Sequence, residues 1–416
     1  MNAYREMYEQ FANDAAFLWL LRSIATDQPN YVSADLLELE ERIDMHLDGL
    51  MTAPDVSWDI CADAMSIEQP GEIFAAAVLA FRSLDINKIQ QVVELGLRSE
   101  EGVLGLTSAL GWLPGKICHS WIKKFLTSKD LNHKYLAIAA CSVRREDPSE
   151  YLTSIFQRVD CLSHQKLYAR SLRLVGELKR RDLSGALPIA LRSDNPEVLF
   201  WAAWSEVMLG DKSAVKLLQP FALAPGPFQS WAIDTVFRVL PILEGREWIS
   251  VLAKDPAQVR NVIKATTALG DPHAINWLVA QMQIPALSRL AGEAFATITG
   301  IDLEEHQLAL AELPDLDGVL PDGPTESPDD DNVDMSEDER LPFPHSDKVA
   351  ATWQKYQHRF TAGQRYFMGK SIEVEHLKSV FTTGNQRQRR AAAMELSLLQ
   401  PNYFLLNHAA RFGREG

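Results

Sequence analysis

The chain has 416 residues, 46% of them hydrophobic, and a formal net charge of −15. This length and composition are typical of two or three compact domains or of one long repeat array, and they exclude disorder along the whole chain. A tract between Pro314 and Arg340 has eleven acidic residues and one basic residue, a local charge of −10 that leaves −5 for all other residues. Nothing resembles the basic excess that binding to a phosphate backbone requires, so we expect no nucleic acid as a partner.

The first residues, MNAYREMYEQ, contain no basic stretch that leads into an apolar segment. The best apolar runs, residues 15–21 and 73–81, fall short of the roughly 18 residues that span a bilayer. We therefore expect a cytoplasmic protein with no membrane insertion. Four cysteines without a C-x-x-C pair are expected to be reduced residues of the core: Cys61, Cys118, Cys141 and Cys161.

Residues 1–125 are expected to form an irregular helical N-terminal region. One helix follows Ser33, a residue that can cap a helix N-terminus, and its apolar stripe has steps of three and four residues: Leu36, Leu39, Ile43, Leu47 and Leu50. The same steps recur at Tyr168, Leu172 and Val175, and no convincing alternating strand pattern is present. The sequence therefore predicts an all-α protein.

Two stretches, residues 209–218 and 269–278, share the pattern L-G-D-x-x-A-[VI]-x-x-L. Glycine can end one helix in the left-handed conformation and aspartate can cap the next helix, so both residues of the pattern are predicted to be structural. Other turns near residues 147, 182 and 245 give spacings of 26 to 35 residues. This is the period of a solenoid of helix pairs, which we expect over residues 126–300.

Residues 301–345 contain the acidic tract and several prolines, and we expect a linker or loop because they cannot bury enough apolar surface to fold. A calcium loop that starts at Asp330 would place Met335 where glycine is needed and Leu341 where a bidentate glutamate is needed. The remaining alternatives are a solvated spacer or an acidic arm that docks on a basic partner or on the chain's own arginines. Residues 346–416 are expected to form a C-terminal helical cap.

An ordered series of short motifs covers most of the chain: Ala16–Leu21 (AFLWLL), Met45–Leu50 (MHLDGL), Pro70–Ala75 (PGEIFA), Ala109–Pro114 (ALGWLP), Glu339–Pro344 (ERLPFP), Gly363–Tyr366 (GQRY) and Arg389–Leu396 (RRAAAMEL). This series resembles a bacterial family of HEAT-repeat proteins, some of whose members lie near type VI secretion genes. The resemblance implies an α-solenoid of HEAT-like helical pairs in a Gram-negative cytoplasm, with a role in interbacterial antagonism. It implies no catalytic or ligand-binding residues.

Motifs of enzymes and cofactor sites are not found. Gly111–Lys116 (GWLPGK) is one residue too short for a phosphate-binding loop, and Ile117 stands where serine or threonine would bind magnesium, so a turn between helices is the better explanation. The ten histidines are scattered, and the pair Cys161-x-x-His164 has no second pair to complete the tetrahedral shell of a zinc site. We expect a protein that is not an enzyme and has no cofactor.

Two kinds of residue are candidates for partner binding. Four arginines precede predicted turns between helices: Arg144, Arg145, Arg180 and Arg181. They either stabilise helix C-termini or form a basic stripe that meets an acidic partner or the chain's own acidic tract. Trp201 and Trp204 lie three residues apart on one predicted helix; core packing explains most such residues, and the alternative is that one lines a groove and anchors a partner.

The sequence thus favours a scaffold that binds another protein across an extended surface. We expect a type VI secretion-associated adaptor or chaperone whose partner is a secreted effector or toxin. The first alternative is an immunity protein that neutralises a cognate toxin, because mild acidity suits a basic nuclease. The second alternative is a HEAT-like enzyme that acts on nucleic acid, which would need a cationic surface.

Overall fold

The computed structural model describes residues 2–311 and 337–412. In these residues the chain forms 22 α-helices and one hairpin of two-residue strands, β1 (Tyr366–Phe367) and β2 (Lys370–Ser371). The predicted all-α fold class is confirmed. The sequence does not indicate the hairpin, because its turn residues Met368 and Gly369 have positive φ without the Asn-Gly signature of such turns.

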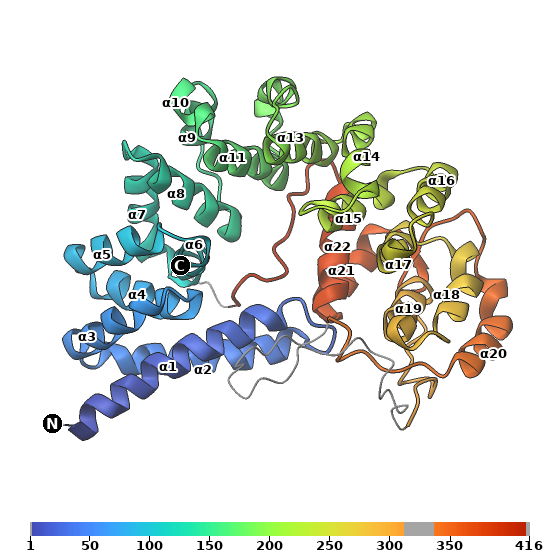
Figure 1. Cartoon of the computed structure of the whole chain (residues 1–416), viewed down its shortest axis with the longest axis horizontal. Helices are drawn as coiled ribbons and strands as arrows, with labels where there is room; N and C mark the ends of the chain where they lie inside the picture. Colours follow the sequence, from blue (N-terminus) through green and yellow to red (C-terminus); the bar gives the residue numbers. More distant parts are fainter. Residues whose placement is uncertain (1, 312–336, 413–416) are drawn as a thin grey trace. The chain divides into compact units, whose positions relative to one another are not determined.

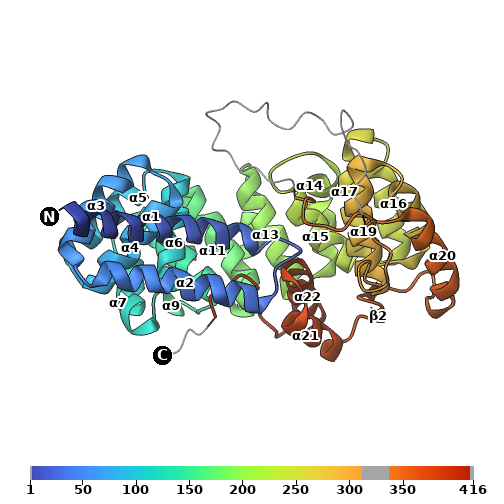
Figure 2. The same ribbon diagram turned by 90° about the horizontal axis from the view of Figure 1, so that it is seen from below.

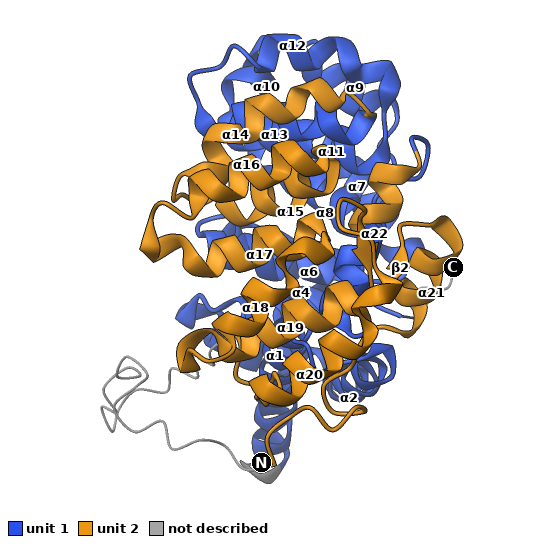
Figure 3. Cartoon of the chain, turned by 90° about the vertical axis from the view of Figure 1, so that its right-hand side faces the viewer, with its two compact units in different colours: residues 1–209, 385–393, 401–416 blue, residues 210–384, 394–400 orange. Residues whose placement is uncertain are grey.

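The chain divides into two compact units, which Figure 3 shows in different colours. Unit 1 contains residues 1–209, 385–393 and 401–416, and unit 2 contains residues 210–384 and 394–400. Helix α22 (Gln386–Leu399) contributes residues to both. The units do not coincide with the four segments expected from the sequence: the N-terminal region and the first part of the array fall in one unit, and the last residues of the chain return to it.

Unit 1 is built from thirteen helices that precede residue 210, together with part of α22. Their bounds are α1 (Asn2–Ala25), α2 (Ser33–Met51), α3 (Pro54–Ala64), α4 (Pro70–Ser83), α5 (Ile86–Gly96), α6 (Glu100–Trp112), α7 (Gly115–Thr127), α8 (Leu131–Arg144), α9 (Glu150–Phe156), α10 (Val159–Ser163), α11 (Gln165–Leu178), α12 (Leu187–Ala190) and α13 (Pro196–Leu209), with the 3₁₀-helices η1 (Met65–Ile67) and η2 (Arg181–Ala186). Helices α4, α6, α8, α11 and α13 pack against one another in this order (Figure 1). This order of neighbours is the one expected for stacked helix pairs.

The first helices of unit 1 enclose α4, in which every residue from Ile73 to Phe81 is buried. Helices α1 and α2 lie side by side (Figure 2), and the predicted apolar stripe of α2 is buried. The expected cap at Ser33 is wrong, because Ser33 is already the first helical residue. The Asp35 carboxylate instead accepts a hydrogen bond from the Val32 amide at 2.8 Å.

Unit 2 has eight helices of its own and part of α22. Their bounds are α14 (Val215–Leu223), α15 (Gln229–Val239), α16 (Ile242–Leu252), α17 (Val259–Leu269), α18 (Ile275–Gln281), α19 (Pro285–Thr299), α20 (Ser346–Tyr356) and α21 (Val374–Thr383), with the 3₁₀-helices η3 (Lys212–Ala214), η4 (Pro256–Gln258), η5 (Pro272–Ala274) and η6 (Gln357–Arg359). Helices α15, α17 and α19 pack in sequence, and α18 packs against both α19 and α20. Val349 and Trp353 of α20 are buried in the same apolar cluster as α19.

Both copies of the L-G-D pattern have the predicted roles. Gly210 and Gly270 adopt positive φ, at 105° and 68°. The side chains of Asp211 and Asp271 each accept a hydrogen bond from the main-chain amide two residues later, at the start of η3 and η5. The glycine ends one helix and the aspartate begins the next, as expected.

An extended segment, residues 363–369, lies along the C-terminal ends of helices in unit 2. The Arg365 guanidinium donates to three main-chain oxygens, Ala268 O at 3.1 Å, Leu269 O at 3.1 Å and Arg238 O at 2.7 Å. Main-chain amides of the segment donate to Gly270 O, Thr297 O and Ile298 O. The ends of α15, α17 and α19 are therefore satisfied by residues that come 71 to 127 positions later in the sequence.

We predict that Gly270→Ala destabilises unit 2. A Cβ at this position would lie 2.6 Å from the carbonyl oxygen of Tyr366, and its φ of 68° is unfavourable for alanine. The expected loss in the free energy of unfolding is roughly 2 kcal/mol, measured by denaturant titration. Gly226→Ala is the matched control, since no atom lies within 4 Å of its Cβ; equal losses for the two variants would contradict the prediction.

Candidate protein-interaction site

Residues 401–412, which we call the strap, form an extended segment of unit 1 with no helix or strand. The strap passes the C-terminal ends of α11, α8 and α6 in that order, opposite to their order in the sequence. Figure 1 shows it as an extended ribbon at the red end of the chain. Leu405 is its one buried residue, so the strap is held mainly through polar contacts.

The helix ends accept hydrogen bonds from donors of the strap. These bonds are Leu405 N to Glu177 O at 2.8 Å, Asn407 Nδ2 to Val143 O at 2.8 Å and Arg411 Nη1 to Trp112 O at 2.6 Å. The last four carbonyl groups of an α-helix have no amide partner within the helix. The strap therefore pairs groups that α11, α8 and α6 leave unpaired.

Three arginines of unit 1 bind main-chain carbonyl oxygens of the strap. The pairs are Arg181 Nη2 to Pro401 O at 3.2 Å, Arg145 Nε to Leu405 O at 2.6 Å and Arg22 Nη2 to Ala409 O at 2.9 Å. The three acceptors are spaced by four residues. Because the arginines contact the main chain, these bonds do not depend on the identity of the strap's side chains.

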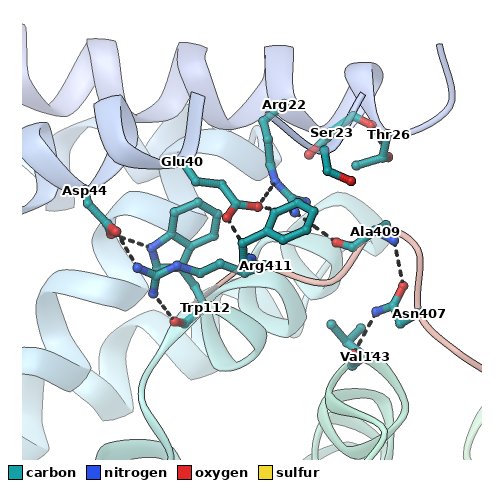
Figure 4. Close-up of polar contacts among 12 residues, drawn as sticks. Arg22, Ser23, Thr26, Glu40, Asp44, Trp112, Val143, Asn407, Ala409 and Arg411 are labelled. Carbon is teal, nitrogen blue, oxygen red and sulfur yellow. Dashed lines mark hydrogen bonds and ion pairs between the residues drawn. The ribbon is translucent and has the colours of Figure 1, made fainter. Parts of the chain in front are cut away.

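The Glu40 carboxylate of α2 connects one of these arginines to the end of the strap (Figure 4). Its side chain is 2% exposed and lies 2.6 Å from Arg22 Nη2. Its second oxygen accepts a hydrogen bond from the Phe412 amide at 2.8 Å. Burial raises the pKa of Glu40 above its ordinary value, although Arg22 acts in the opposite direction.

Asp44, one turn farther along α2, binds the side chain of Arg411 (Figure 4). The same carboxylate accepts a hydrogen bond from the Trp112 indole at 2.9 Å. The Arg411 guanidinium lies over the Trp112 ring, 4.6 Å from its centroid, where a cation is attracted to the aromatic face. Arg411 thus makes an ion pair, a main-chain hydrogen bond and a ring contact at one place.

Glu177 fixes the orientation of Arg145, the arginine that binds Leu405. Its side chain is fully buried, 3.1 Å from Arg145 Nη1 and 2.8 Å from Arg173 Nε, and it accepts a hydrogen bond from Ser142. Burial alone would raise the pKa of Glu177, but the nearby arginines lower it to about 2. The carboxylate therefore remains charged at any pH at which the protein is expected to work.

The structure brings two of the four predicted arginines to the strap. Arg145 and Arg181 bind its main chain, as described above. Arg144 instead donates to two main-chain carbonyls at the end of α6, and Arg180 pairs with two neighbouring aspartates. All four lie near helix ends, which agrees with the structural alternative, and the two at the strap also contact a segment from elsewhere in the chain.

Trp201 and Trp204 are both buried, with exposed fractions of 6% and 0%. Their rings pack edge to face, with centroids 5.5 Å apart, and the Arg173 guanidinium lies 4.6 Å from the centroid of Trp201. Neither ring lies at the surface, where it could anchor a partner. The pair belongs to the core, and Trp201 supports one of the arginines that surround Glu177.

The acidic tract, expected to be either a solvated spacer or a docking arm, lies largely outside the described residues, since residues 312–336 are not among them. At its described end, Glu337 lies 2.9 Å from Lys264 and Asp338 lies 2.6 Å from Arg260, both on α17. The described part of the tract therefore pairs with cations of unit 2.

Sequence reasoning missed the residues that hold the end of the strap: Arg22, Glu40, Asp44 and Arg411. A signal for Glu40 exists, because it lies four residues after Leu36 on the face of α2 that the apolar stripe predicts to be buried. A carboxylate on such a face requires a buried cation or donor. The sequence cannot indicate that one such donor lies about 370 positions away.

Among residues 2–311 and 337–412 no group of three or more His, Cys, Asp or Glu side chains could hold a metal ion. The four cysteines are buried, as predicted, and burial raises the pKa of the Cys61 and Cys141 thiols to about 12. Residues 111–116 comprise the last two residues of α6, the connection at residues 113–114 and the first two residues of α7. No helix in the described part of the chain is long and apolar enough to cross a membrane.

We predict that Glu177→Gln destabilises unit 1 by about 3 kcal/mol or more, because Arg145 and Arg173 would be left with an uncompensated buried charge. Denaturant unfolding at pH 7 measures the loss. Glu100→Gln is the control: Glu100 is exposed and pairs with Lys166 at the surface, so a change below about 0.5 kcal/mol is expected.

The stabilities of wild type and Glu177→Gln should depend differently on pH. Because the pKa of Glu177 is lowered in the folded state, its contribution is present above the ordinary glutamate pKa and is lost as the pH falls toward about 2. The stabilities of wild type and Glu177→Gln should therefore approach each other in acid. A constant difference between pH 7 and pH 3 would contradict this account of Glu177.

No protein-family model, curated protein or solved structure matches this chain. The resemblance to bacterial HEAT-repeat proteins thus depends on the motif series in the sequence and stays a prediction.

Proposed function

We propose that this chain is a non-enzymatic scaffold that binds an extended segment of another protein along the helix ends of unit 1. One observation supports the proposal: an extended segment, the strap, already occupies these helix ends through hydrogen bonds on both sides of its main chain. A surface that holds one extended chain in this way has the groups needed to hold another.

The chemistry of the surface suits an extended ligand. An extended segment presents unpaired amides and carbonyls, and most helical surfaces cannot pair with them because their own main chain is already bonded. Here the ends of α11, α8 and α6 offer carbonyl acceptors, and Arg22, Arg145 and Arg181 offer donors. Main-chain bonds then provide affinity and side-chain contacts provide selectivity, as in other modes of peptide recognition.

The role we propose for this scaffold is that of an adaptor or chaperone for a secreted effector or toxin, as the resemblance to the HEAT-repeat family implies. An adaptor or chaperone of this kind would hold an extended segment of its partner. An immunity protein would need a surface complementary to a folded toxin. The extended form of the strap favours the adaptor over the immunity protein.

We predict that a photo-crosslinking amino acid at position 27 captures a partner in the native cell. Asp27 is exposed, and its Oδ1 lies 3.9 Å from Nε2 of His408 in the strap. Position 189 is the control, since Ile189 is 69% exposed and lies on α12, which is not one of the helices whose ends the strap binds. Mass spectrometry should identify one second polypeptide crosslinked at 27 and not at 189.

Two results would count against the proposal. One is the absence of any second polypeptide at position 27 in the native cell. The other is the same set of crosslinked proteins at both positions, which would indicate contact without a specific site.

A further inference from the structure

We infer that the strap competes with the partner's segment for the same helix ends of unit 1, and that this segment resembles the strap in sequence. The segment has a leucine-sized apolar residue followed six positions later by arginine. This inference rests on the proposed function and adds the chemistry of the ligand to it. The spacing is that of Leu405 and Arg411, the two strap residues whose side chains make the most selective contacts.

The strap is held in a way that permits exchange. Leu405 is its only buried residue, and Phe404 is 42% exposed. Its other residues are exposed or partly exposed, and hydrogen bonds and ion pairs hold them to side chains that include the buried Glu40. A second segment with the same groups can form the same bonds. A competing segment with equivalent donors and acceptors can therefore take the place of the strap without any change in the helices.

The positions along the strap differ in what they recognise. Pro401, Leu405 and Ala409 are bound by arginines at their carbonyl oxygens, and Phe412 is bound at its amide, so these four contacts accept any residue that has the group. Side chains are recognised in addition: the apolar side chain of Leu405, the amide of Asn407, the imidazole of His408 beside Asp27, the guanidinium of Arg411 and the ring of Phe412 beneath Arg389.

Arg411 is the most selective of these side chains. Its guanidinium meets the Asp44 carboxylate, the Trp112 carbonyl oxygen and the face of the Trp112 ring together. Lysine has a single compact charge and cannot form this planar set of contacts. We therefore expect the partner to carry arginine, and not lysine, at this position.

The strap belongs to the same chain as its surface, so its effective concentration there is high and it lowers the apparent affinity for any free segment. Weakening the strap should then strengthen the binding of a peptide in trans. The occupant we propose is a separate polypeptide; the strap of a second copy is the other occupant that this chemistry admits.

The experiment uses the full chain and a fluorescent peptide with the strap sequence, PNYFLLNHAARF. Fluorescence anisotropy gives its affinity for wild type, for Arg411→Ala, which weakens the strap, and for Arg158→Ala. Arg158 is the matched control, because it is exposed and pairs with Asp160 at the surface. We expect Arg411→Ala to bind the peptide about tenfold or more tightly than wild type, and Arg158→Ala to match wild type.

Peptide variants test the predicted ligand chemistry on the Arg411→Ala chain. Replacement of the peptide's arginine by lysine, or of the leucine at the position of Leu405 by alanine, should lower the affinity about tenfold each. Asn407→Ala is a second chain variant that weakens the strap, in case Arg411→Ala does not fold. Equal binding to wild type and both weakened chains, or no binding to any of them, would overturn the inference.

Sedimentation of each chain identifies the occupant. Monomers that bind the peptide agree with a separate polypeptide, whereas a dimer of Arg411→Ala that the peptide dissociates would show that a second copy is the occupant and would overturn the proposed partner. The two proposals fail separately. Peptide binding without a crosslinked protein in the cell would contradict the proposed function alone, and a crosslinked partner without peptide binding would contradict this inference alone.

Discussion

Both units depend on one constraint: the main-chain carbonyl groups at the C-terminal ends of their helices need hydrogen-bond donors from elsewhere in the chain. Each α-helix leaves its last four carbonyls without an intrahelical donor, and these ends lie next to one another where helix pairs stack. The chain supplies donors from cationic side chains: Lys134 bonds the end of α7, Arg144 the end of α6 and Lys179 the end of α13. Cations are also favoured there by the helix dipole, so the same residues satisfy both hydrogen bonding and charge.

Extended segments provide the remaining donors, and each unit uses one from later in the sequence. In unit 2, residues 363–369 bond the ends of α15, α17 and α19, and in unit 1 the strap bonds the ends of α11, α8 and α6. Both depend on an arginine, Arg365 or Arg411, that donates to a helix end and pairs with a carboxylate, Glu395 or Asp44. The strap of unit 1 differs in that its main-chain carbonyls are also bound by arginines at every fourth residue. This two-sided recognition is the basis of the proposed role in binding extended partners.

The sequence predicts the features that depend on local chemistry. Helical periodicity indicates the buried stripe of α2, and the Gly and Asp of the L-G-D pattern indicate where one helix ends and the next begins. It also indicates that arginines such as Arg144 belong at helix ends. The sequence does not predict which distant segments pair with those ends, because a hydrogen bond to a main-chain carbonyl requires no particular residue at the acceptor. Trp201 and Arg145 are therefore both candidates for partner binding in the sequence. In the structure Trp201 is buried in the core, whereas Arg145 binds the main chain of the strap.

The strap is a defined part of unit 1 that can nevertheless be exchanged for another segment. The protection of the strap's amides from hydrogen exchange tests this most directly. Leu405 donates its amide to Glu177 O and Phe412 donates its amide to Glu40. Hydrogen exchange of the full chain, resolved at these two residues, measures both bonds under native conditions. We predict slower exchange than in the free strap peptide at both amides, and faster exchange at both in Arg411→Ala. Exchange of both wild-type amides at the rate of the free peptide would contradict the account.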